Sequence, residues 1–216
     1  NVDKVVLCGP PTENKNVDLG ITLAKINGRI FGSHYRSRFL QNMTFRGFNV
    51  FDNVENGWIC SDKDIVSKYN NDPLCNYRFT TNGFLNLYSL MKKAFAREKY
   101  LCKNSDLPIL LIGGKDDPVI QNEKKFSELK QFLESIGYKY VYSRLYDDKR
   151  HELINEVEKE LIWIDILRFF EHSSYYSSWN FKGIDNISNP LKPDDIIFQL
   201  TQDLLSTQQF LKSVLV

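Results

Sequence analysis

The feature that most constrains the fold is a regular alternation of strand and helix patterns between residues 107 and 170. Residues 107–113 (LPILLIG) form a continuous apolar run, which is typical of a parallel strand buried on both faces. An amphipathic helix is expected over residues 122–136, a second strand over 140–146 and a long helix over 152–170. The order strand, helix, strand, helix indicates an α/β protein with a parallel sheet.

The region upstream is expected to be mainly helical. Residues 3–8 (DKVVLC) are expected to form a short buried strand, which a Gly-Pro-Pro turn closes. Helical spacing follows over residues 19–30 and again over 82–100, and a capping box at residues 61–64 predicts the start of another helix. The apolar side of the first of these helices is formed by Leu19, Leu23, Ile26 and Ile30.

Composition excludes several classes of partner. The 216 residues are 42% hydrophobic, which is enough for a real core, and 28 basic against 27 acidic residues give a net charge of +1. No basic block suits nucleic acid, no apolar run has the length of a membrane span, and no His, Cys or Asp cluster has metal-ligand spacing. We therefore expect no nucleic acid, no metal and no cofactor. Four widely spaced cysteines favour free thiols in a reducing cytoplasm.

Two side chains follow the two predicted strands of the 107–170 region. Asp117 comes after the first strand, in GGKDDPV, and Pro118 biases it away from helical conformation. His151 comes after the second strand, in LYDDKRHELINE. Their separation, 151 − 117 = 34 residues, accommodates one crossover helix and one strand. Because functional groups collect beyond the carboxyl ends of parallel strands, Asp117 and His151 are expected at one edge of the sheet.

A carboxylate beside an imidazole has a well-defined chemical use. It fixes the tautomer and stabilises the imidazolium, while the other ring nitrogen takes a proton from a nucleophile. The alternative is structural, with Asp117 as a turn residue and His151 as a polar residue at a helix N-terminus. Spacing alone leaves both interpretations open.

The segments GGKDDPV and LYDDKRHELINE together resemble the C-terminal half of α/β-hydrolases. The resemblance is to the lysophospholipase and monoacylglycerol-lipase-like branch, of serine aminopeptidase S33 type. Further upstream YRSRFLQNMTFRGFN, the W-x-x-S-D of residues 58–62 and DPLCNYRFT resemble the cap of this group, so the resemblance covers residues 3–170. It implies that Asp117 is the acid of a catalytic triad and His151 its general base, with Asp116 as the alternative acid. Arg150 and Glu152 are expected to support the turn.

The resemblance also implies a domain organisation. Residues 1–11 would supply a core strand, 12–100 a helical cap, 101–172 the C-terminal α/β core with acid and base, and 173–216 a tail. The tail departs from the family pattern, and its spacing after Pro193 predicts an amphipathic helix.

The family's nucleophile is expected outside this chain. In the family it lies in G-x-S-x-G and precedes the acid, but no serine here has glycines at that spacing. The chain also begins without Met and almost directly in a predicted strand. It is therefore expected to be a C-terminal fragment that lacks the N-terminal half of the same protein as its partner, and that is inactive alone.

The implied activity is that of a serine hydrolase of carboxylic esters. Lipid esters such as lysophospholipids or monoacylglycerols are the expected substrates, because the cap is rich in aromatic residues, and transient contact of the cap with a membrane surface is expected. Peptides with a free amino terminus are a further candidate, since related hydrolases include aminopeptidases. The alternative function is a non-catalytic, hydrolase-like binding or regulatory module. The apolar cap residues in question are Phe31, Phe39, Met43, Phe45, Phe48, Phe51, Trp58 and Phe84.

Overall fold

The computed structural model describes residues 2–48, 51 and 53–171. The predicted tail, residues 173–216 with its helix after Pro193, lies outside the described residues. None of the described helices is both long enough and apolar enough to cross a membrane.

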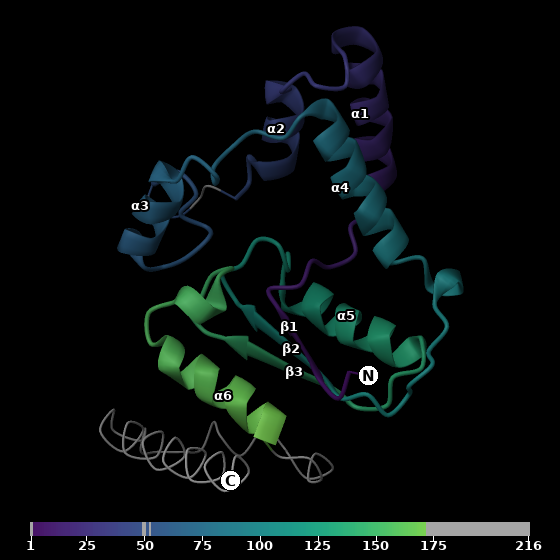
Figure 1. Cartoon of the computed structure of the whole chain (residues 1–216), viewed down its shortest axis with the longest axis vertical. Coiled ribbons are helices and arrows are strands. Elements are labelled where there is room, and N and C mark those ends of the chain that lie inside the picture. The colour runs from purple at the N-terminus through teal and green to yellow at the C-terminus, as the bar shows by residue number, and fades with distance from the viewer. Residues whose placement is uncertain (1, 49–50, 52, 172–216) are drawn as a thin grey trace, which may run out of the picture. The chain divides into compact units, whose positions relative to one another are not determined.

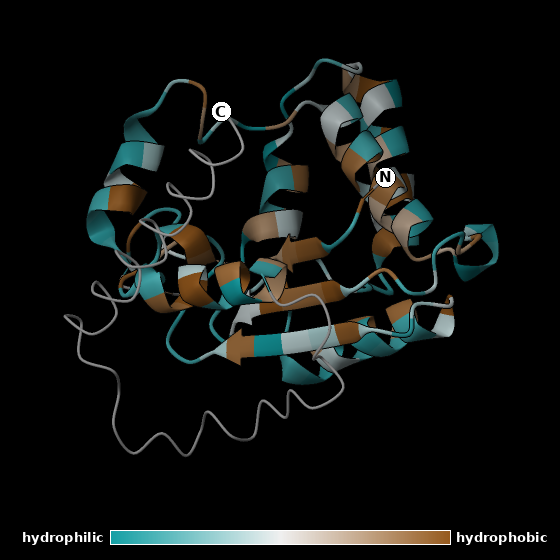
Figure 2. Cartoon of the chain, turned by 60° about the horizontal axis from the view of Figure 1, so that its bottom comes forward, coloured by the Kyte–Doolittle hydropathy of each residue, from teal (hydrophilic) through white to brown (hydrophobic). Residues whose placement is uncertain are grey.

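The core is a parallel sheet of three strands in the order β1-β2-β3 (Figure 1). The strands are β1 (Val5–Cys8), β2 (Ile109–Gly114) and β3 (Val141–Tyr146), and β2 pairs in parallel with both neighbours. Every residue of β2 is buried. The arrows of the sheet accordingly carry much of the hydrophobic colour in Figure 2. The predicted α/β class and all three predicted strands are confirmed.

The helices α5 (Glu123–Ser135) and α6 (Lys159–Glu171) cover opposite faces of this sheet. Successive side chains of a strand point to opposite faces, so adjacent residues of β3 pack against different helices. Val141 joins the buried cluster that contains Phe126 of α5, whereas the ring of Tyr142 meets that of Phe169 of α6 at 6.4 Å. The sheet is therefore buried between two helical layers, as a parallel sheet requires.

The connection from β3 to α6 differs from the sequence prediction. A helix was expected from residue 152, but the chain forms a 3-10 turn, η2 (Leu153–Asn155), and α6 begins only at Lys159. One hydrogen bond and one backbone angle explain why the helix begins later. The carboxylate of Glu156 accepts a hydrogen bond from the backbone N–H of Arg150, and Glu158 has a φ of 59°, a left-handed value that interrupts a right-handed helix.

Between β1 and β2 the chain forms helices, and no strand occurs in the part of this segment that the structure describes. The helices are α1 (Val17–Phe31), α2 (Arg38–Phe45), α3 (Lys63–Asn71), α4 (Thr81–Ala94) and the 3-10 turn η1 (Arg97–Lys99). We refer to residues 12–100 as the cap.

Helix α1 buries a different face from the one that its large apolar residues suggest. Leu19, Ile26 and Ile30 are 57%, 46% and 66% exposed, whereas Gly20 and Ala24 are buried. Small residues are selected because α1 lies close to α4: a Cβ atom on Gly20 would come within 3.1 Å of the Tyr88 ring. Hydrophobic spacing predicted the helix correctly but did not identify its buried side.

Helix α3 begins with Asp62 rather than Ser61 as its N-cap. The Asp62 side chain accepts hydrogen bonds from the N–H groups of Asp64 and Ile65, at 2.9 and 3.4 Å. The predicted capping box therefore gave the right place for the helix but the wrong capping residue. Ser61 is instead bonded to Glu156, 95 residues further along the chain.

Candidate active site

Asp117 lies on the loop that follows β2, which we call the acid loop (residues 115–122). Its backbone N–H donates to the Gly114 carbonyl at 3.2 Å, and its Oδ1 accepts from the Val119 N–H at 2.8 Å. This local turn uses one carboxylate oxygen and fixes the side-chain direction. The residue is only 2% exposed. Burial and the turn together aim the second oxygen, Oδ2, at the end of the neighbouring strand.

His151 lies on the loop after β3 and meets Asp117 there. Its Nδ1 is 2.9 Å from Oδ2 of Asp117. Because an ionised carboxylate only accepts, Nδ1 carries the proton of this hydrogen bond, and Nε2 is the ring nitrogen that can receive another. The imidazole is 30% exposed while the carboxylate is fully buried. The carboxylate thus lies behind the imidazole, away from solvent, which is the arrangement that a general base with an orienting acid requires.

The contacts of Asp116 and Asp117, the two candidate acids, differ. Asp116 is exposed, and its backbone N–H donates to the Lys149 carbonyl at 3.0 Å. The structure therefore brings Asp117, and not Asp116, into hydrogen-bond contact with His151. Glu152, expected to support the turn, accepts a hydrogen bond from the Asn155 amide at 2.8 Å.

Two glycines form the surface against which the base loop (residues 150–156) rests. Gly9 has a φ of 55°, and a Cβ there would lie 2.9 Å from Nδ1 of His151. A Cβ on Gly114 would lie 2.0 Å from the Lys149 carbonyl oxygen and 2.4 Å from that of Arg150. Sequence reasoning used these glycines only as strand terminators. Their position at the ends of β1 and β2 was the available signal for a close approach to the site.

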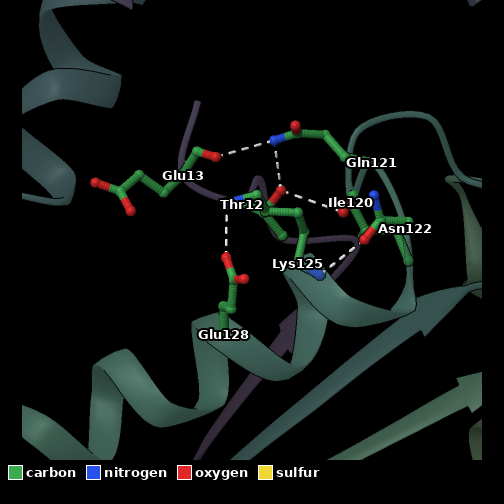
Figure 3. A network of polar contacts seen from close by, with 7 residues as sticks. All are labelled: Thr12, Glu13, Ile120, Gln121, Asn122, Lys125 and Glu128. Atoms are coloured by element: carbon green, nitrogen blue, oxygen red, sulfur yellow. Dashed lines mark hydrogen bonds and ion pairs between the residues drawn. The ribbon is translucent and has the colours of Figure 1, made fainter. Parts of the chain in front are cut away.

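A polar network joins the first residues of the cap, Thr12 and Glu13, to the acid loop (Figure 3). The Thr12 hydroxyl donates to the Ile120 carbonyl at 3.1 Å, and the Gln121 amide donates to the Thr12 hydroxyl at 2.8 Å and to the Glu13 carbonyl at 3.1 Å. Thr12 is 1% exposed. The network therefore fixes the loop that carries Asp117 to the chain leaving β1.

The imidazole also borders an aromatic part of the cap. The Trp58 ring centroid is 5.2 Å from that of His151, and the Trp58 carbonyl accepts the His151 backbone N–H at 3.4 Å. Phe48 meets Trp58 at 5.1 Å and Phe45 at 5.5 Å. The contacts continue from Phe45 to Phe84, which is fully buried in the cap core. A series of rings thus connects the cap interior with the candidate base.

The site has no set of side chains suited to a metal. Among the residues that the structure describes, no group of three His, Cys, Asp or Glu side chains is placed to hold an ion. The nearby thiol of Cys60 donates to the Asn155 carbonyl at 3.4 Å, and burial raises its pKa to about 11. This thiol remains protonated at neutral pH and acts as a structural donor.

The parallel sheet, the helical insertion after β1 and the acid and histidine beyond β2 and β3 together define an α/β-hydrolase fold. The family model described as serine aminopeptidase, S33, matches residues 1–158. The chain belongs to this family.

Solved structures of similar fold agree with this assignment. The chain is similar to a lipase in its open form, with 22% identity and a TM-score of 0.67 over 78% of this chain and 56% of that one. It is similar to a thermostable carboxyl esterase from Bacillus coagulans in complex with glycerol, with 22% identity and a TM-score of 0.62 over 78% and 56%.

A third similar structure is a monoacylglycerol lipase from Paleococcus ferrophilus, with 20% identity and a TM-score of 0.54 over 77% of this chain and 58% of that one. No curated protein matches the chain. The chain thus spans a little more than half the length of these solved structures, and the likeness shows the shared fold.

Proposed function

We propose that this chain supplies the acid and the base of a serine hydrolase that cleaves carboxylic esters of lipids, such as lysophospholipids or monoacylglycerols. The observation that carries the proposal is the 2.9 Å contact between Nδ1 of His151 and Oδ2 of Asp117 at the carboxyl edge of the sheet. Membership of the S33 family supports it. The nucleophile would come from a segment outside these 216 residues, which contain no G-x-S-x-G.

In this mechanism His151 is the proton carrier. Its Nε2 takes the proton of the serine hydroxyl while the serine oxygen attacks the ester carbonyl, and returns that proton to the leaving alcohol. Water then attacks the acyl-enzyme while Nε2 takes a proton from it, and Nε2 returns that proton to the serine oxygen as the fatty acid leaves. Asp117 keeps Nδ1 protonated and stabilises the imidazolium in both steps.

The cap supports a lipid rather than a peptide substrate. The rings of Phe45 and Trp58, which are only partly buried, offer apolar surface beside His151. The exposed apolar residues Leu19, Ile26 and Ile30 of α1 support transient contact of the cap with a membrane surface. A cytoplasmic location is part of the same proposal, with the free cysteines as its support.

The substrate class can be tested with an acyl-length series. The protein to use is a polypeptide in which this chain follows, in frame, a segment that contains G-x-S-x-G. We expect kcat/KM for 4-nitrophenyl esters to rise at least about tenfold from acetate to octanoate, because each buried methylene contributes about 0.8 kcal/mol. Steady-state hydrolysis rates measure this.

Two results would contradict the proposed function. Faster cleavage of aminoacyl amides with a free amine than of any ester would assign a peptide substrate. Binding of monoacylglycerol without any hydrolysis would assign the non-catalytic binding module instead.

A further inference from the structure

The base loop contains a buried carboxylate that the triad chemistry does not use. Glu156 is 1% exposed, five residues after His151. Its Oε1 accepts the backbone N–H of Arg150 at 2.8 Å and that of Ser61 at 3.1 Å. Its Oε2 accepts the Ser61 N–H at 3.2 Å and the Ser61 hydroxyl. A buried carboxylate is stable only with such donors, and here they come from two distant segments.

The same two segments are joined along their length. Residues 57–61 of the cap, which we call the cap segment, provide carbonyl acceptors to the base loop. The Arg150 guanidinium donates to Gly57 at 2.6 Å and to Cys60 at 3.1 Å, and the Glu152 N–H donates to Ile59 at 2.7 Å. These bonds place the base loop against the cap segment, and the carboxylate of Glu156 receives donors from both.

We propose that Glu156 is a positioning residue for His151 and that it couples the base to the cap segment. The Arg150 N–H lies one residue before His151, so its bond to Glu156 fixes the backbone that carries the imidazole. The Ser61 bonds make this arrangement depend on the cap segment being in place. Without the Ser61 donors, the carboxylate of Glu156 would be held less firmly, and its hold on the Arg150–His151 backbone would weaken.

The substitution Glu156→Gln tests this role, because it changes the hydrogen-bonding capacity of the side chain and keeps its size. A carboxylate offers two acceptor oxygens, and Glu156 uses both. A glutamine amide keeps one acceptor and turns an NH2 group toward backbone donors, either the N–H groups of Arg150 and Ser61 or that of Ser61 alone. The base loop then has to shift, since donors cannot face one another when buried.

The experiment measures the hydrogen bond between His151 and Asp117 by NMR in the whole 216-residue chain. Its readout is the rate at which the low-field Nδ1 proton of His151 exchanges with solvent. We expect Glu156→Gln to accelerate this exchange about tenfold, which corresponds to the net loss of roughly one hydrogen bond. Ser61→Ala should accelerate it severalfold, and Glu160→Gln, the same chemical change at an exposed position, should leave it unchanged.

Ser61→Ala separates positioning from charge, because it keeps the Glu156 carboxylate and removes only a donor. It also serves as the test if Glu156→Gln fails to fold. Unchanged exchange in Ser61→Ala would overturn the coupling to the cap, and unchanged exchange in a folded Glu156→Gln would overturn the positioning role.

The catalytic consequence of this inference rests on the proposed function, whereas the exchange measurement requires no nucleophile. Faster exchange in both variants supports the inference even if the extended polypeptide hydrolyses no ester. In an active polypeptide, Glu156→Gln should lower kcat and leave KM unchanged, because the substrate does not touch Glu156 in this account.

Discussion

Changing Asp117 to asparagine should lower the kcat of ester hydrolysis by about four orders of magnitude in the polypeptide that includes the nucleophile segment. The asparagine can keep the local turn, because its carbonyl oxygen can still accept the Val119 N–H. Its NH2 group then faces Nδ1 of His151, which must act as an acceptor. The proton of the neutral imidazole moves to Nε2, so the base can no longer take a proton from the serine.

Asp116→Asn is the matched control for this experiment. It makes the same chemical change at the adjacent, exposed aspartate, and we expect kcat to change less than about twofold. A large loss in Asp116→Asn with little loss in Asp117→Asn would contradict the assignment of the acid. Comparable losses in both would show that charge near the loop, rather than the imidazole tautomer, determines the rate.

Changing Gly114 to alanine should destabilise the 216-residue chain by at least about 3 kcal/mol. The added Cβ would lie 2.0 Å from the Lys149 carbonyl oxygen and 2.4 Å from that of Arg150. Both are backbone atoms, one of the residue before the base loop and one of its first residue, so no side-chain rotation can relieve the overlap. The whole loop must move, and the hydrogen bonds to the cap segment are lost with it. Urea denaturation followed by circular dichroism measures the change in the free energy of unfolding.

Gly47→Ala provides the control for backbone flexibility. A Cβ at Gly47 meets no atom within 4 Å, so the free energy of unfolding of this variant should differ by less than about 1 kcal/mol from that of the parent chain. An equal urea midpoint for Gly114→Ala and the parent chain would contradict the close packing of β2 against the base loop.

The sequence predicted the core well, because local patterns encode it. A continuous apolar run gave β2, and turns and caps placed α5 between Asn122 and Gly137. Once two neighbouring strands were expected, the juxtaposition of Asp117 and His151 followed from topology alone. These features depend on residues close together in the sequence or on the general rules of parallel sheets.

The features that sequence reasoning missed depend on contacts between distant segments. Ser61 fits a capping pattern, yet its hydroxyl binds Glu156 on the base loop. Glu156 fits the first turn of a long helix, yet its carboxylate folds back to Arg150 and delays α6. Helical spacing likewise predicted that the large apolar residues of α1 form its buried side, whereas Gly20 is in close contact with Tyr88 of α4. No local pattern contains this information. Ser61 lies far from Glu156 along the chain, as Gly20 does from α4, and the bond between Glu156 and Arg150 belongs to no regular helix or strand.

The most direct test of the central account is labelling with a fluorescent fluorophosphonate, which reacts with an activated serine. The polypeptide to label carries this chain in frame after a segment with G-x-S-x-G, and His151→Ala is the comparison. We predict that the serine of G-x-S-x-G is labelled and that the labelling rate falls about a thousandfold in His151→Ala. Labelling of a serine within the 216 residues, or an equal rate in both forms, would contradict the assignment of this chain as the acid and base of a serine hydrolase whose nucleophile lies outside it.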